Sequence, residues 1–327
     1  MTIPSVSPDL GISWLPAAVS DADELSELFN AIAEADDTPE RLSAKSMEHE
    51  LTSYFNPLEE RTLVARDPND AIVGYATAYC RRSEAEEMRA YVNVYVAPSW
   101  RDRGLEDAMT DWAIEAGTRA LRDVSTERRY VCAWLYNKQE EASVRFADRG
   151  FTPVRHWWDM ERILDTDIPI SSTGGFAIVP WEECFDKAAR FVYNAAFSDH
   201  WGSTPMDESS WLKQVIESPS FRRNYSFVAV GDGDVVGYAA CAEYPEDWES
   251  AGRREAWIEG LGVVRSWRKR GIATSLLAHA MQAMKANGIE ATLIGVDSDS
   301  PSRAQHLYQR LGFTTKTTGV TWQLELS

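Results

Sequence analysis

Basic residues and long apolar runs are both scarce in this chain. Its 327 residues include 33 Lys and Arg against 51 Asp and Glu, which gives a formal net charge of −18. A nucleic-acid-binding protein needs a basic face that neutralises phosphates, so this balance argues against a nucleic-acid partner. No apolar run approaches the length of a membrane span, and the first residues show neither a basic stretch nor an apolar signal core. We therefore expect a cytoplasmic protein without a membrane partner.

Cysteine and histidine are also few. The four cysteines lie far apart in apolar settings and form no C-x-x-C pair, which predicts buried free thiols: Cys80, Cys132, Cys184 and Cys241. The five histidines show no His-Glu-x-x-His spacing or similar ligand pattern. We therefore expect no metal site.

The most informative segment is a basic glycine turn. It follows the apolar run 257–264, which predicts a strand, and precedes the pattern 275–286, which predicts a helix. Its residues are Arg268, Lys269, Arg270, Gly271, Ile272, Ala273 and Thr274. Free backbone N–H groups at a helix N-terminus, backed by the helix dipole, bind phosphate. Gly271 lets the backbone approach the anion closely. This turn predicts a diphosphate site.

The spacing of the turn matches neither a Walker A loop nor the dinucleotide fingerprint. It resembles instead the R/Q-x-x-G-x-G/A turn that binds the pyrophosphate of coenzyme A in GNAT-type N-acetyltransferases. The resemblance implies acetyl-CoA as cofactor, with Leu261 and Val263 of the preceding strand also contributing to its site.

A second motif lies about thirty residues further on. The string A-x-x-L-Y-x-x-L-G-F runs from Ala304 to Phe313 and resembles the second half of the coenzyme A site in the same family. Ser300 fits a helix N-cap, and Gly312 fits the left-handed residue that closes a helix. The resemblance places Ser300 and Ala304 at the cofactor and the hydroxyl of Tyr308 beside the thioester sulfur.

The chain also carries an internal repeat. The tripeptide Val-Gly-Tyr occurs at 73–75 and 236–238, and Arg-x-Arg-Gly occurs at 101–104 and 268–271. A Gly-Phe pair closes each copy, at 150–151 and 312–313. Landmarks in one order and at nearly one offset predict a duplicated domain.

The two copies differ at two positions that the chemistry requires. Glu106 stands where the second copy has Ala273, and a carboxylate beside a pyrophosphate repels it. Phe146 stands where the second copy has Tyr308, so the first copy has no hydroxyl there. We expect the first copy to be structural or to shape the substrate site, with weak cofactor binding through Arg101, Arg103 and Gly104 as the alternative.

These features predict an α/β fold of two tandem GNAT-like domains, each a mixed, mostly antiparallel central sheet flanked by helices. A degenerate domain is expected at 1–164, a linker at 165–175 and a domain with intact acetyl-CoA motifs at 176–327. This domain order is similar to that of the mycothiol synthase family and related two-domain acetyltransferases of actinobacteria.

The resemblance implies transfer of an acetyl group from acetyl-CoA to a primary amine, which needs a general base because the amine arrives protonated. Glu259 is the first candidate, on the strand before the turn, and strand alternation would place it on one face with Trp257 and Leu261. Glu255 and Glu243 are the rival bases.

Two further roles complete the implied mechanism. A backbone N–H at about 261–263, where the strand bulges from its neighbour, would stabilise the oxyanion, and Tyr308 would protonate the departing thiolate. The acceptor is expected to be a small-molecule amine, and the chain a monomer or a homodimer. Three alternatives stay open: a non-catalytic acetyl-CoA-binding module, an acyltransferase that uses a longer acyl-CoA, and a purely structural duplicated domain.

Overall fold

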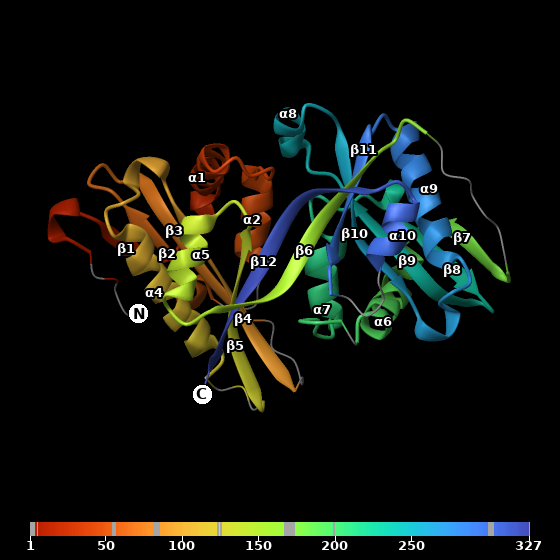
Figure 1. Cartoon of the computed structure of the whole chain (residues 1–327), viewed down its shortest axis with the longest axis horizontal. Helices are drawn as coiled ribbons and strands as arrows, with labels where there is room; N and C mark the ends of the chain where they lie inside the picture. Colours follow the sequence, from red (N-terminus) through yellow and green to blue (C-terminus); the bar gives the residue numbers. More distant parts are fainter. Residues whose placement is uncertain are drawn as a thin grey trace. The chain divides into compact units, whose positions relative to one another are not determined.

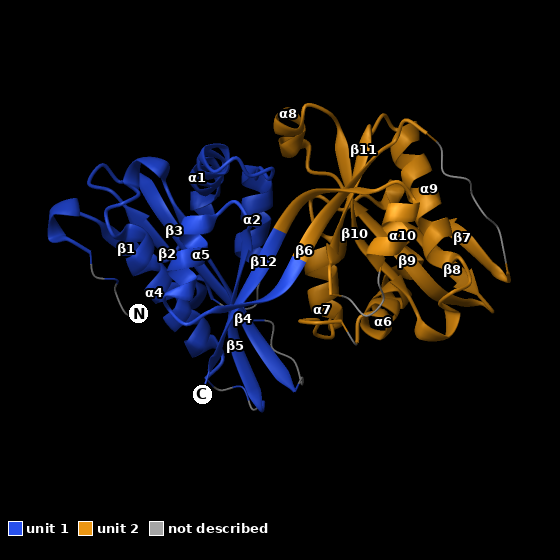
Figure 2. Ribbon diagram, viewed as in Figure 1, with its two compact units in different colours: residues 1–156, 319–327 blue, residues 157–318 orange. Residues whose placement is uncertain are grey.

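The computed structural model describes residues 4, 6–53, 57–80, 86–122, 124, 126–166, 174–198, 200–299 and 304–326. The chain divides into two compact units, coloured separately in Figure 2. Unit 1 comprises residues 1–156 and 319–327, and unit 2 comprises residues 157–318.

Unit 1 is a sheet with strand order β1-β2-β3-β4-β5-β12, in which β4 and β5 are parallel and the other printed pairs antiparallel (Figure 1). Its strands are β1 (Ser13–Leu15), β2 (Thr62–Arg66), β3 (Ile72–Cys80), β4 (Glu87–Val96), β5 (Arg128–Tyr136) and the last part of β12 (Thr314–Leu326). Its helices are α1 (Ala22–Ala35), α2 (Ala44–Ser53), α3 (Leu58–Arg61), α4 (Leu105–Ala120) and α5 (Glu140–Ala147).

Unit 2 repeats this plan with strand order β7-β8-β9-β10-β11-β6, and β10 and β11 are its parallel pair. Its strands are β7 (Phe176–Pro180), β8 (Phe227–Gly231), β9 (Asp234–Ala242), β10 (Glu255–Val263), β11 (Ala291–Asp297) and the second half of β6 (Thr152–Ile163). Its helices are α6 (Asp186–Ala196), α7 (Glu208–Trp211), α8 (Trp248–Ala251), α9 (Ile272–Ala286) and α10 (Ala304–Arg310). The predicted fold class, α/β with mixed, mostly antiparallel sheets flanked by helices, is confirmed.

The repeat holds at the level of strand register. Gly74 in β3 pairs with Val96 at the end of β4, and Gly237 in β9 pairs with Val263 at the end of β10. Both glycines lie under the helix that follows the basic turn, because an added Cβ would meet Met109 of α4 or Ile272 of α9 within 3.0 Å. The Val-Gly-Tyr landmark therefore marks the same packing position in each copy.

The compact units do not follow the chain order of the predicted domains. Residues 157–163 of β6 pair with β11 in unit 2, while residues 319–326 of β12 pair with β5 in unit 1. The units therefore differ from the predicted divisions 1–164, 165–175 and 176–327. Residues 157–163 belong to unit 2, and the C-terminal residues 319–327 belong to unit 1. Most of the predicted linker lies outside the described residues, and the roles of the two copies stay predictions.

Each unit packs its central helix onto its sheet. Helix α9 buries Leu276, Leu277 and Met281, and α4 buries Met109 and Trp112. In the part of the chain that the structure describes, no helix is long and apolar enough to span a membrane.

The thiols of Cys80, Cys132 and Cys241 are buried in the strands. Cys184 is exposed in the turn before α6, so the prediction that all four thiols are buried is wrong for that residue.

Candidate active site

The parallel strands β10 and β11 separate part-way along their length. They pair only between Glu255–Trp257 and Ala291–Leu293, although β10 continues to Val263 and β11 to Asp297. The backbone of the second half of β10 is therefore bonded to β9 on one side and open on the side of β11. This opening is where a ligand can reach strand backbone inside a sheet.

A β-bulge interrupts β10 at the predicted base. Ile258 pairs with Cys241 and Gly260 with the next residue, Ala240, so Glu259 is an extra residue without a partner in β9. The bulge thus lies before Leu261, and the prediction that the strand bulges at 261–263 is wrong, because those residues are in register with β9.

The bulge also changes which side chains share a face. Ile258 and Leu261 both pack into the core beneath α9, whereas strict alternation would have placed Leu261 with Glu259. Gly260 and Gly262 face the ring of Tyr238, where an added Cβ would lie 2.9 Å from its hydroxyl oxygen and 2.7 Å from a ring carbon. Tyr238 is in turn packed against Trp181, 5.8 Å away between ring centroids.

The basic turn has the backbone geometry of an anion site. Lys269 has φ 64° and Gly271 has φ 84°, both left-handed, and α9 begins at Ile272. The first N–H groups of such a helix have no intrahelical acceptor and carry the positive end of its dipole.

The three cations of the turn have different surroundings. Arg268 donates to the carbonyls of Val263 at 3.1 Å and Ala196 at 2.9 Å, so it ties the end of α6 to the end of β10. Arg270 lies over the ring of Trp267, 4.4 Å from its centroid. Lys269 is exposed and lines the cavity described next.

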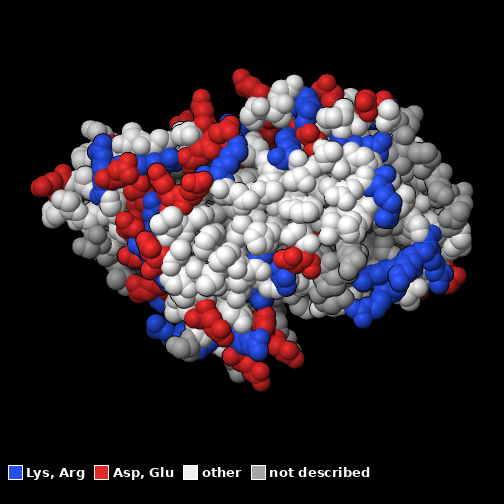
Figure 3. Space-filling model, in the orientation of Figure 1, with Lys and Arg blue, Asp and Glu red and all other residues white. Residues whose placement is uncertain are grey.

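A cavity of about 830 Å³ joins the open part of β10, the basic turn and α10. Its lining includes Arg265, Arg268, Lys269 and Arg310 together with His200 and His306. No Asp or Glu is among the described residues that line it. Figure 3 shows Lys and Arg side chains gathered over the part of unit 2 where α6 and the start of α9 lie. In a chain of net charge −18, this cavity is suited to a polyanion.

Most of the predicted cofactor residues meet in this cavity. Its lining contains Leu261, Val263, Arg268, Lys269, Gly271, Ile272, Ala273, Thr274, Ala304 and Tyr308. Arg270 and Glu259 are not part of the lining, and Ser300 lies outside the described residues. Sequence reasoning missed the other lining residues, which come from α6 and the loop after it, from the end of β10 and the turn after it, and from α10: Ala196, Phe197, His200, Gly262, Arg265, Trp267, His306, Leu307 and Arg310. No short motif signals α6, because this helix reaches the site only through tertiary packing.

Tyr308 stands on α10 with 6% of its surface exposed. Its ring packs on Phe313, 5.9 Å away, and its carbonyl accepts from the N–H of Phe313 after Gly312 closes the helix with φ 85°. Burial raises the pKa of the Tyr308 hydroxyl above its ordinary value. The group therefore holds its proton at neutral pH and can act as a donor.

Glu259 keeps solvent contact while protein atoms crowd its carboxyl group. Oε1 accepts a 2.9 Å hydrogen bond from the hydroxyl of Tyr244. Removal of solvent raises the pKa of Glu259, the bond from Tyr244 lowers it, and the negative charge of Asp159 raises it, with a net upward shift. An accessible carboxylate with a raised pKa is suited to accept a proton.

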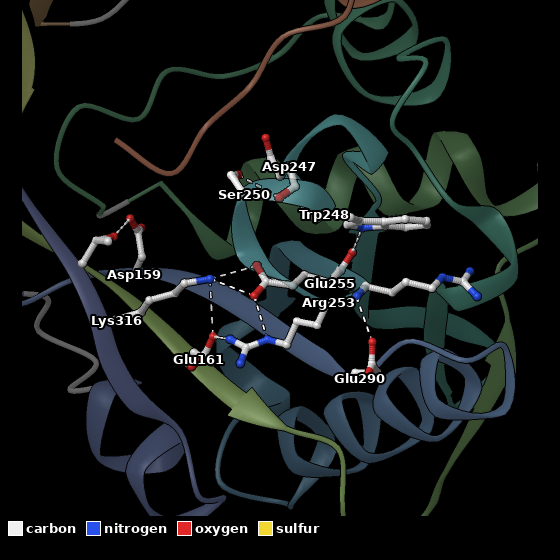
Figure 4. A network of polar contacts seen from close by, with 11 residues as sticks. Asp159, Glu161, Asp247, Trp248, Ser250, Arg253, Glu255, Glu290 and Lys316 are labelled. Carbon is white, nitrogen blue, oxygen red and sulfur yellow. Dashed lines mark hydrogen bonds and ion pairs between the residues drawn. The ribbon is translucent and has the colours of Figure 1, made fainter. Parts of the chain in front are cut away.

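The two rival bases are committed to fixed partners. Glu243 is buried, accepts from the hydroxyl of Tyr225 at 2.7 Å and pairs with Arg222 at 2.8 Å. Glu255 is 5% exposed and pairs with Arg253 at 2.9 Å and Lys316 at 2.8 Å; this network is drawn in Figure 4. Both carboxylates are bound by cations or donors on the protein itself, which favours a structural role.

Unit 1 repeats the backbone of the turn but not its chemistry. Asp102 and Gly104 have φ 61° and 79°, as at the equivalent positions of unit 2, yet the N–H of Asp102 donates to the carboxylate of Glu106 at 3.2 Å. Strand β4 pairs with β3 from Ala90 to Val96 without a register shift, so unit 1 has no bulge at that position. Phe146 occupies the position of Tyr308 and packs on Phe151 at 5.0 Å.

Within the described residues, no group of three or more His, Cys, Asp or Glu side chains is arranged to hold a metal ion.

Comparison with known proteins agrees with this geometry. Residues 187–313 match the sequence model of the Acetyltransferase (GNAT) family. The chain is 26% identical over 266 residues to the mycothiol acetyltransferase of Mycobacteroides abscessus, covering 78% of this chain and 82% of that protein. A shorter match, 29% identical over 89 residues, covers 27% of this chain and 57% of N-alpha-acetyltransferase 30 of Schizosaccharomyces pombe.

Two solved structures share the fold over almost the whole chain. A GCN5-related N-acetyltransferase from Sphaerobacter thermophilus aligns with TM-score 0.73 and 24% identity, covering 96% of this chain and 95% of that one. A tandem GNAT protein from the clavulanic acid biosynthesis pathway aligns with TM-score 0.70 and 16% identity, covering 96% and 98%.

The separated strands, the glycine turn and the closing helix thus define a protein of the GNAT class, and the likeness to a tandem GNAT protein extends over both units. Residues 187–313 thus match the GNAT acetyltransferase family, and the similarity to named acetyltransferases supports an enzyme of the transferase type.

Proposed function

We propose that unit 2 transfers an acetyl group from acetyl-CoA to the primary amine of a small molecule. The observation that carries the proposal is the single cavity in which the open strand β10, the start of α9 and Tyr308 meet without a carboxylate in the described lining. This arrangement brings together a site for a polyanion, the proton donor Tyr308 and the open backbone of β10. Acetyl-CoA would supply the acetyl thioester.

The residues of the turn would hold the diphosphate of the cofactor. The N–H groups at the start of α9 would bind it, Lys269 would add charge, and Ala273 leaves the helix surface uncrowded. Arg268 is bound to two protein carbonyls, so its contribution is to fix the turn relative to α6 rather than to bind phosphate directly.

Two side chains would move protons. Glu259 would take the proton of the ammonium, directly or through water, because its carboxyl is accessible and has a raised pKa. Tyr308 would protonate the departing thiolate from inside the cavity. A backbone N–H of the open part of β10, between Leu261 and Val263, would stabilise the oxyanion.

The acceptor would reach Glu259 along the same face as Asp159. Asp159 pairs with Gly295 across β6 and β11, and its Oδ1 lies 3.8 Å from the position of a Cβ on Gly295. Its other oxygen accepts from the hydroxyl of Thr317 at 2.5 Å. Two carboxylates near each other attract a cationic amine, which supports an amine rather than an anionic or neutral acceptor.

The proposal is tested by incubating the full chain with acetyl-CoA and a panel of primary amines. We expect at least one amine to release free coenzyme A and to gain an acetyl group, identified by mass. Gly271→Glu should abolish this turnover. The equivalent change in unit 1, Gly104→Glu, imposes the same left-handed strain at φ 79° and should leave turnover unchanged. Loss of turnover only in Gly104→Glu would contradict the assignment to unit 2.

A further inference from the structure

Unit 1 has its own cavity at the place that corresponds to the cofactor cavity of unit 2. Its volume is about 540 Å³, and it is lined by the second half of β4, the start of α4, the end of β5 and α5, with α1 closing one side. Like β10 and β11, the parallel strands β4 and β5 separate: their pairing stops at Tyr91 and Cys132. The duplication has therefore preserved the hollow.

The charge of this second cavity is the opposite of the first. Its lining contains five acidic residues, namely Asp36, Glu40, Glu106, Glu140 and Glu141. Its three cations are all paired: Arg101 with Asp36 at 2.6 Å, Lys138 with Asp37, and Arg145 with Asp107 at 3.7 Å. Across the described residues, no Lys or Arg pairs with Glu106, Glu140 or Glu141.

Glu106 changes the anion site itself. Its carboxylate accepts from the N–H of Asp102 at 3.2 Å, beside the left-handed Gly104 that opens α4. An N–H group of the turn is thus already bound by a carboxylate of the protein, and a diphosphate at the start of α4 would meet that negative charge at close range. Every Lys or Arg among the described lining residues is paired with a carboxylate, so none is available to hold a phosphate.

Aromatic rings supply the remaining walls. Phe29 and Tyr95 meet edge to face with centroids 5.4 Å apart, and Trp134 and Tyr136 meet at 4.5 Å. All four rings line the cavity. Carboxylates together with aromatic faces are the surroundings that bind organic ammonium ions, through charge and through cation–π attraction.

We propose that the cavity of unit 1 binds a small organic ammonium ion. The site is separate from the acetyl-transfer site of unit 2 and does not depend on the proposed function. The two cavities have the same place in the fold, but the side chains that line them differ in charge. The basic lining of unit 2 suits an anion, and the acidic lining of unit 1 suits a cation.

The experiment is calorimetric titration of the intact chain with spermidine, with the ionic strength of titrant and cell matched. We expect one site per chain. Glu106→Gln should weaken it about tenfold, as should Trp134→Leu, because the first removes one carboxylate of the lining and the second removes one of its aromatic rings. Glu115→Gln is the matched control on the same helix: Glu115 is outside the cavity lining, pairs with Arg119 and should leave binding unchanged.

Three results would overturn the proposal. One is absence of saturable spermidine binding by the folded wild-type chain. Another is binding at several equivalent sites that Glu115→Gln weakens as much as Glu106→Gln, which would indicate attraction to the acidic surface as a whole. The third is loss of the site in Asp159→Asn with retention in Glu106→Gln, which would place it at the carboxylates of unit 2. Acetyl-CoA binding, measured separately, tests the proposed function independently.

Discussion

The hydroxyl of Tyr244 donates a 2.9 Å hydrogen bond to Oε1 of Glu259, the one residue that the bulge leaves without a partner in β9. The bulge therefore takes the carboxylate out of the strand pairing, while the bond from Tyr244 holds it in place. This relationship separates Glu259 from Glu255 and Glu243, which are bound by cations of the protein.

The pH dependence of turnover should respond in opposite directions to changes at the two neighbours of Glu259. The bond from Tyr244 lowers its pKa and the charge of Asp159 raises it. Because a base works only when deprotonated, the acid limb of kcat/KM against pH should move to higher pH in Tyr244→Phe and to lower pH in Asp159→Asn. Rate measurements across the acidic range check both. Shifts in the same direction would show that Glu259 is not the titrating base.

Removing the hydroxyl of Tyr308 should reduce turnover without weakening cofactor binding. Tyr308 is buried and lines the cavity, so Tyr308→Phe removes a proton donor while the ring keeps its packing on Phe313. We expect kcat to fall by ~10²–10⁴-fold, the range of general acid–base groups, with the Kd for acetyl-CoA unchanged. Steady-state kinetics and titration give the two numbers.

The control for that variant is the same substitution in unit 1. Tyr91→Phe, on β4, should leave kcat unchanged. An unchanged kcat in Tyr308→Phe as well would remove Tyr308 from the mechanism.

The ion-pair network around Glu255 should contribute to stability and not to catalysis. Glu255→Gln leaves Arg253 and Lys316, 27% and 23% exposed, with Glu161 as the one carboxylate that they still share. We expect the free energy of unfolding to drop by about 2–4 kcal/mol, below the largest losses of fully buried pairs because both cations keep some solvent. Denaturant unfolding measures this, with exposed Glu249→Gln as the matched control.

The kinetics of Glu255→Gln distinguish the two roles. The folded fraction should retain the wild-type pH profile of kcat/KM. Loss of the acid limb in that variant would instead identify Glu255 as the base.

Local patterns carried much of the prediction from sequence. The turn from Arg268 to Thr274 and the closing Gly312–Phe313 depend on short-range geometry, left-handed glycines and helix ends, which adjacent residues specify. The fold class followed from the repeat, because each landmark marks one packing position.

Long-range pairing explains what the sequence did not reveal. The bulge at Glu259 depends on the register of β10 with β9 and on the ring of Tyr238 over Gly260, neither of which strand alternation specifies. The division of β6 and β12 between the units depends on partners far away in the chain. The partners of Glu243 and Glu255 come from other elements for the same reason.

The central claim is that unit 2 holds the only acetyl-CoA site. Calorimetric titration of the full chain with acetyl-CoA tests it most directly, repeated with Ala273→Glu, which places in unit 2 the carboxylate that Glu106 supplies in unit 1. Ala286→Glu, the same change at the exposed far end of α9, is the control. The account predicts one site in the wild type and in Ala286→Glu, and none in Ala273→Glu. Two sites in the wild type, or a site that survives Ala273→Glu, would contradict it.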